Sequence, residues 1–221
     1  MTIEPPGPHL RAELVARGVE VSEDAAASAF RAEIGYYLAH HLEGHDAASL
    51  DRLRDRCAGV IVDALDAPAL DLPNAREAML AAIRFSAFRD AAPTLRDLRR
   101  RGLRLVVASN WDVSLADVLD RAGLATLVDG VVSSAEVGAP KPSPQLFEAA
   151  LERAGVAARR ALHVGDSVAG DVDGARAAGL RAVLIQRADP LGASVRALEE
   201  SPSAPSDVPT IADLHELRSL V

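Results

Sequence analysis

Three groups of polar residues in this sequence could together bind and transfer a phosphoryl group. Ser109 and Asn110 follow the apolar run LRLVVA, Lys141 follows the VVSS region, and Asp166 with Asp171 follows ALHVG. A hydroxyl and an amide can bind phosphoryl oxygens, an ammonium neutralises their charge, and carboxylates suit Mg²⁺. If the chain brings these groups together, they hold the inventory for phosphoryl transfer.

Each group alone has an ordinary structural explanation. Ser109-Asn110 and Asp166-Ser167 could each be a helix N-cap, and Lys141-Pro142 could be a surface loop. All three groups, however, come directly after successive predicted strands. In open parallel sheets, ligands bind beyond the carboxyl ends of the strands, so this shared position favours a binding site.

The elements that would position these residues alternate between helix and strand after Asn74. LRLVVAS is an apolar, β-branched run that suits a buried parallel strand. Strands separated by helices of this length predict a parallel sheet with right-handed crossovers. The other predicted strands are DGVVSS, ALHVGD and RAVLIQ; the predicted helices are NAREAMLAAIRF, DAAPTLRDLRRRG, VSLADVLDRAG, SPQLFEAALERAG, DVDGARAAG and the terminal IADLHELRSL.

The first part of the chain reads as helices with few breaks. Ser22 is a plausible N-cap, and Gly18 and Gly44 are plausible helix stops. A Pro- and Asp-rich stretch, DAPALDLPNA, separates this part from the remainder. We therefore predict two domains, a helical one over 1–72 and an α/β one over 73–221.

Composition and charge exclude several classes of partner. The net charge of −8 and the isoelectric point near 5.2 argue against nucleic acid and against anionic membranes as partners. The single cysteine, Cys57, cannot form an intramolecular disulfide, and no apolar run is long enough to cross a bilayer. We expect a cytoplasmic protein whose substrate is a small molecule, and we leave open a homodimer.

Three ordered motifs make the chain resemble the haloacid dehalogenase (HAD) superfamily of hydrolases. VVASNWD is similar to the family's second motif, GAPKPSPQLFEAAL to its third, and HVGDSVAGDVDGARAAG to its fourth. The resemblance covers about Phe85 to Gln186, and the preceding helices resemble the four-helix cap of many members. It implies a Rossmann-like three-layer fold with a helical cap and a Mg²⁺-dependent phosphatase acting on a small phosphorylated substrate.

The resemblance also implies a role for each residue at the strand ends. Ser109 would bind a phosphoryl oxygen with help from Asn110, and Lys141 would pair with the nucleophile and the phosphate. Asp166 would ligate Mg²⁺ directly. Asp171 would complete the metal site by holding a metal-bound water, or would orient Lys141. Trp111, next to Asn110, would lie at the mouth and touch substrate.

The family's first motif, an apolar strand ending in a nucleophilic aspartate, has no match before the helical segment. Asp63, after the apolar residues of VIVDAL, is a substitute candidate, but Leu53, Cys57 and Ile61 recur there at helical spacing. In the family this strand lies in the middle of the sheet, so its absence would leave buried backbone groups unpaired. We therefore expect an upstream extension that supplies the first core strand, and an inactive chain without it.

Two other functions stay open. SNWD and the helical cap also resemble the dehalogenase branch, which hydrolyses carbon–halogen bonds without metal, although the acidic pair Asp166 and Asp171 weighs against it. A catalytically silent binding module is the third hypothesis. His40, His41 and His45 are interpreted as exposed residues at a helix end rather than a Zn²⁺ site, Tyr36 and Tyr37 as packing residues, and Cys57 as a small buried hydrophobe.

Overall fold

The computed structural model describes residues 1–67, 69–187 and 205–221. It divides into two compact units, one comprising Thr2–Ser86 and the other comprising Met1 with Ala87–Val221. Each unit has its own hydrophobic core. Within the described part of the chain, every helix is too short or too polar to cross a lipid bilayer.

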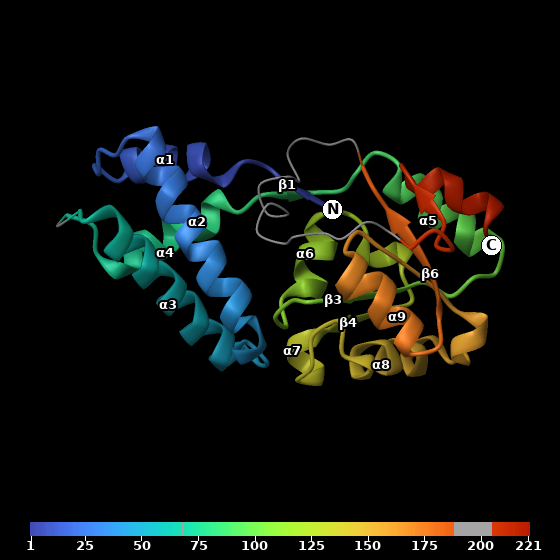
Figure 1. Cartoon of the computed structure of the whole chain (residues 1–221). Coiled ribbons are helices and arrows are strands. Elements are labelled where there is room, and N and C mark those ends of the chain that lie inside the picture. Colours follow the sequence, from blue (N-terminus) through green and yellow to red (C-terminus); the bar gives the residue numbers. More distant parts are fainter. Residues whose placement is uncertain (68, 188–204) are drawn as a thin grey trace. The chain divides into compact units, whose positions relative to one another are not determined.

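The first unit is a bundle of four α-helices, which lie alongside one another (Figure 1). Its elements are β1 (Thr2–Ile3), α1 (Pro6–Ala16), α2 (Glu23–His40), the 3₁₀ turn η1 (His41–Glu43), α3 (Ala47–Leu65), α4 (Leu72–Ala82) and β2 (Phe85–Ser86). Ser22 caps α2 by accepting a hydrogen bond from the backbone N–H of Ala25, as its sequence position predicts. Gly18 follows α1 with a positive φ of 79°, which a glycine adopts without steric cost.

The boundary between the units lies further along the chain than the expected break after residue 72. Helix α4 packs against α1 and α3, and its buried face (Ala75, Ala78, Met79 and Ala82) is part of the helical core. Pro73, in the first turn of α4, begins this helix instead of ending the helical unit. The division therefore falls after Ser86.

The second unit is a three-layer α/β structure. Its elements are α5 (Ala91–Arg100), β3 (Val106–Ser109), α6 (Leu115–Arg121), η2 (Ala125–Leu127), β4 (Gly130–Ser133), α7 (Ser134–Val137), α8 (Pro144–Ala154), η3 (Ala158–Arg160), β5 (Leu162–Gly165), the π-helical turn η4 (Val168–Asp173), α9 (Gly174–Ala177), β6 (Arg181–Ile185), β7 (Thr210–Ile211) and η5 (Leu214–Ser219). The predicted terminal helix is instead β7 followed by the 3₁₀ segment η5.

Helices cover both faces of these strands. On β6, Ala182 and Leu184 face a cluster that includes Phe147 of α8, whereas Val183 faces a cluster that includes Leu98 of α5. This alternation follows from the two-residue period of a strand. Helices α8 and α9 lie next to each other, as Figure 1 shows. The predicted arrangement of helices on both faces of a parallel sheet is confirmed.

The strands form two separate parallel groups in the described residues. Strand β3 pairs with β4, and β5 pairs with β6, which in turn pairs with β7. All four residues of β3 and all four of β5 are partly exposed, whereas four of the five residues of β6 are buried. Within the described chain, therefore, β3 and β5 each have one edge without a strand partner.

Candidate functional site

The residues predicted at the strand ends come together at one rim of the second unit. Ser109 is the last residue of β3, and Asp166 directly follows β5. Lys141 lies in the loop between α7 and α8, and Asp171 lies in the π-helical turn η4. Hydrogen bonds through Lys141 link the end of β3 to the turn after β5, so that three segments distant in sequence share one site.

Asn110 fixes the backbone of the loop between α7 and α8 at Lys141. Its side-chain oxygen accepts from the backbone N–H of Lys141 at 2.7 Å, and its side-chain nitrogen donates to the backbone carbonyl of Lys141 at 3.2 Å. Because both ends of the amide are used in this way, the geometry favours a positioning role for Asn110. Its predicted help in phosphoryl binding stays a prediction.

Asp171 is a buried carboxylate with four hydrogen-bond donors. Oδ1 accepts from Lys141 Nζ at 2.6 Å and lies 2.8 Å from His163 Nε2, while Oδ2 accepts from the backbone N–H groups of Asp166 and Ser167, both at 3.0 Å. A carboxylate has about four lone-pair sites. Since all of them are occupied here, the geometry favours the orienting role of Asp171 over its role in holding a metal-bound water. Its part in a metal site stays a prediction.

These contacts keep Asp171 ionised. Burial by itself raises the pKa of its carboxyl group, but the hydrogen bond from His163 and the charge of Lys141 outweigh that effect. The pKa of Asp171 is therefore held well below its ordinary value. Throughout the neutral pH range, Asp171 presents a negative charge to the ammonium of Lys141.

Lys141 is the only lysine in the whole sequence; every other Lys-or-Arg position is an arginine. Its side chain is 15% exposed, and it forms an ion pair with Asp171. An ammonium is a compact point charge with three donors, whereas a guanidinium is a planar fork, so the two do not replace each other at a small site. The single lysine of this arginine-rich chain thus lies at this rim, and its pairing with a phosphate stays a prediction.

Ser109 and Asp166 are the other predicted site residues at this rim. The Ser109 side chain makes no hydrogen bond within the described residues, and its hydroxyl lies at the end of β3. The Asp166 side chain is exposed, and its backbone N–H is fixed by Asp171. In the described residues, no three acidic, histidine or cysteine side chains cluster in a way that could hold a metal ion. Direct ligation of Mg²⁺ by Asp166, whose carboxylate is an oxygen ligand of the kind this cation prefers, stays a prediction.

Trp111 is held by backbone hydrogen bonds to Ser134 and by packing of its ring. Its backbone N–H donates to Ser134 Oγ at 3.0 Å, Ser134 Oγ donates back to its carbonyl at 3.2 Å, and its ring packs against the core cluster of α5 and α6. Contact between Trp111 and substrate stays a prediction.

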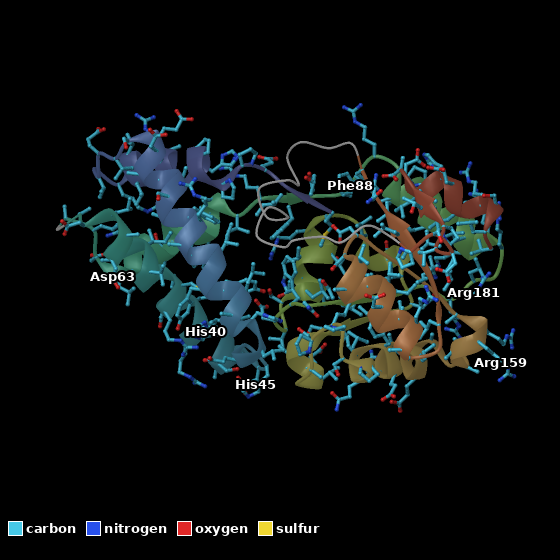
Figure 2. All side chains as sticks on the ribbon, in the orientation of Figure 1. His40, His45, Asp63, Phe88, Arg159 and Arg181 are labelled. Atoms are coloured by element: carbon cyan, nitrogen blue, oxygen red, sulfur yellow. The ribbon has the colours of Figure 1, made fainter. Side chains whose placement is uncertain are left out.

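The other candidates lie in the helical unit. Asp63 is exposed on α3, where Figure 2 labels it, so helical spacing rather than a strand is confirmed at this position. Cys57 is buried, as expected, and hydrogen-bonds to Glu33. His45 is exposed, but His41 is buried and bonded to the carbonyl of Leu38, so the expected exposure is wrong for His41. Tyr36 and Tyr37 pack against the helical core, as predicted.

His163 belongs to the site, although the motifs did not single it out. It lies on β5 two residues before Gly165, and alternate residues of a strand point to the same face. A Cβ built on Gly165 would lie 2.0 Å from Cγ of Asp171, so the glycine leaves the space that Asp171 occupies. No local pattern in the sequence singles out His163, because its partner Asp171 lies in the turn that follows the strand.

Comparison with known proteins shows to which family the chain belongs. A model of the haloacid dehalogenase-like hydrolases matches residues 8–179. The chain belongs to the haloacid dehalogenase-like hydrolases, as the three motifs and the α/β fold predicted.

Two curated relatives match about half of the chain. The chain is 44% identical over 106 residues to "Haloacid dehalogenase-like hydrolase domain-containing protein 3" of Mus musculus (48% of this chain, 42% of that protein). It is 44% identical over 105 residues to the phosphoserine phosphatase of Thermus thermophilus (47% and 42%). The chain thus spans less than half the length of these relatives in the matched region.

Solved structures support the fold alone. The L-2-haloacid dehalogenase of Xanthobacter autotrophicus superposes with a TM-score of 0.68 at 21% identity, covering 99% of this chain and 94% of that chain. A magnesium-bound putative HAD-hydrolase of Bacillus subtilis gives a TM-score of 0.66 at 17% identity, covering 99% and 93%.

Proposed function

We propose that this protein hydrolyses a small phosphate ester with the help of Mg²⁺, through a covalent aspartyl-phosphate. The observation that carries the proposal is the convergence of Ser109, Lys141 and Asp166 at one rim of the parallel strands, with the ammonium of Lys141 held by Asp171. Relatives named as phosphoserine phosphatase and glyceraldehyde 3-phosphate phosphatase support the class of reaction.

The described residues divide the work between binding and orientation. The Ser109 hydroxyl would donate to one phosphoryl oxygen, and Lys141 would place its positive charge beside the phosphate. Asp171 would hold Lys141 in position through the 2.6 Å ion pair. Asp166 would hold Mg²⁺, which supplies positive charge to stabilise the phosphoryl oxygens in the transition state.

The nucleophile is the one part of this chemistry that these residues do not supply. Ser109 and Lys141 have the roles just given, and Asp171 is saturated with donors. The open edges of β3 and β5 support the proposal that an extended segment ending in an aspartate pairs with both strands. Such a segment would place a carboxylate beside Ser109 and Asp166, because the carboxyl ends of parallel strands meet at one edge.

A matched pair of fusions tests the proposal. An apolar strand segment ending in Asp, or in Asn as the control, is joined to the chain through a flexible linker, and phosphate release from p-nitrophenyl phosphate is followed. We expect Mg²⁺-dependent turnover with Asp only, lost again in Lys141→Ala. A folded Asp fusion without activity contradicts the proposal, as does activity of the unfused chain that Asp63→Asn abolishes.

Two alternative functions predict different results for the same pair of fusions. A carbon–halogen hydrolase would release chloride from 2-chloropropionate without Mg²⁺. A catalytically silent binding module would show neither activity in either fusion, while still binding inorganic phosphate or Mg²⁺ at the rim in a way that Asp166→Ala removes.

A further inference from the structure

Among the residues that the structure describes, the side chains of Lys141 and His163 both contact the Asp171 carboxylate. Nε2 of His163 lies 2.8 Å from Oδ1 of Asp171, the same oxygen that accepts from Lys141 Nζ. The side chain of His163 is 15% exposed and that of Asp171 is 4% exposed. Bonds between largely buried groups of this kind are short and strong, because water competes for them weakly.

The direction of the His163–Asp171 bond follows from the surroundings of Asp171. Asp171 is ionised, so its carboxylate has no proton to donate, and it already accepts from an ammonium and two backbone N–H groups. The carboxylate is therefore an acceptor toward all four partners, and His163 must carry its proton on Nε2.

The orientation of the His163 ring is set by packing on α8. The ring of Phe147 meets it edge to face, with centroids 5.0 Å apart and planes at 89°. Phe147 is itself buried, and it approaches this position because Gly174 has no side chain: a Cβ there would lie 2.7 Å from the Phe147 ring. The aromatic contact leaves the ring little freedom to turn away from Asp171.

We propose that His163 is a positioning residue of the site, which holds the Asp171 carboxylate so that the only lysine of the chain stays directed at the phosphoryl position. His163 donates from Nε2 to Oδ1, and the backbone N–H groups of Asp166 and Ser167 hold Oδ2. With both oxygens fixed, Lys141 has one preferred place for its ammonium. This inference deepens the proposed function, on which it rests.

The single lysine makes the inference measurable without turnover. Protein grown with ¹⁵N-lysine gives one side-chain ammonium signal, which belongs to Lys141. Loss of a hydrogen bond to a charged group changes an equilibrium by about tenfold or more. We expect His163→Phe, which keeps a ring but loses the donor, to speed hydrogen exchange of the Lys141 ammonium by about tenfold at one fixed pH.

The conservative variant and a distant control separate positioning from packing. His163→Gln keeps a nitrogen donor, so its exchange rate should stay within about twofold of the wild-type rate. A twofold change corresponds to only a small part of the free energy of one hydrogen bond. His45→Gln, at an exposed histidine of the helical unit, should leave the rate unchanged. A folded His163→Phe protein with the wild-type exchange rate overturns the proposal.

The wild-type protein provides a second test if His163→Phe does not fold. With ¹⁵N-histidine, the Nε2 signal of His163 should show a directly bonded proton. A ring that is unprotonated at Nε2 overturns the proposal. Neither measurement depends on catalysis, so a failed phosphatase assay leaves this inference testable by itself.

Discussion

Gly165 illustrates how a missing side chain shapes the rim. We predict that Gly165→Ala displaces Asp171, because the added Cβ would lie 2.0 Å from its Cγ. The expected loss of stability is about 2 to 3 kcal/mol, typical of overpacking a buried site, measured by urea denaturation. Gly59→Ala on α3, where a Cβ meets nothing within 4 Å, is the matched control and should not destabilise the protein. Equal stability of both variants would contradict this role of Gly165.

Glu33 is a buried carboxyl group in the core stripe of α2, 4% exposed and hydrogen-bonded to Cys57. Burial raises its pKa from 4.5 to about 7, against the opposing effect of the Cys57 bond. In the folded state it therefore keeps its proton between those two pH values, whereas the unfolded chain has lost it. Stability should fall as pH rises through this window and level off above about 7.

The glutamine variant tests this pH dependence. The difference between 4.5 and about 7 corresponds to about 3 kcal/mol. We predict that Glu33→Gln removes most of this pH dependence and melts at a higher temperature than the wild type at pH 8. Thermal melts followed by circular dichroism across the window would check it, and a wild-type midpoint independent of pH would refute the assignment.

At the scale of elements, Asp90 connects three segments. It lies at the N-cap of α5, yet its Oδ2 accepts from Arg187, after β6, at 2.8 Å and from the backbone N–H of Leu214, at the start of η5, at 2.7 Å. Asp90 is 8% exposed, and the guanidinium of Arg187 also lies 4.0 Å from the ring centre of Phe88. The carboxylate thus joins the first helix of the α/β unit to the residue Arg187 after β6 and to the start of η5.

Breaking this connection should be costly. We predict that Asp90→Ala destabilises the protein by about 3 kcal/mol, since it leaves a largely buried guanidinium and a backbone N–H without their acceptor. A double-mutant cycle with Arg187→Ala, measured by urea denaturation, should show that the two losses are not additive. Additive losses would mean that the pair contributes nothing as a pair.

The elements that the sequence predicts well are those whose signal is local. The strands LRLVVAS and RAVLIQ are apolar runs, and Ser22 caps α2 in its own first turn. The terminal IADLHELRSL was wrongly predicted as one helix because Ile211 pairs with Ile185 of β6, and Asp213 starts a new 3₁₀ segment at Leu214. Pairing between distant strands overrides local helical spacing.

The candidate site shows the same limit. Ser109, Lys141 and Asp166 were predictable because each follows a strand signal, and parallel strands end at one rim. His163 was not, because its role depends on Asp171, which reaches it through a turn, and on the ring of Phe147. The partners of Asp90 lie 97 and 124 residues away, beyond any local pattern.

At the scale of the whole molecule, the two units have separate cores. The helical core draws on all four helices, α1 to α4, and includes Leu10, Phe30, Leu53 and Met79. We predict that a fragment spanning residues 2–86 folds by itself and melts cooperatively, with the pH dependence expected from Glu33. Circular dichroism of the fragment checks this, and a fragment without a cooperative transition would contradict the independence of the helical unit.

The measurement that tests the central claim most directly is a titration of the whole protein with inorganic phosphate in the presence of Mg²⁺, observed through the ¹⁵N signal of its only lysine. The account predicts a saturable shift of the Lys141 signal, weakened by Ser109→Ala and by Asp166→Asn and unchanged by His45→Gln. A Lys141 signal that does not move at saturating phosphate and Mg²⁺ would contradict the claim that this rim binds a phosphoryl group.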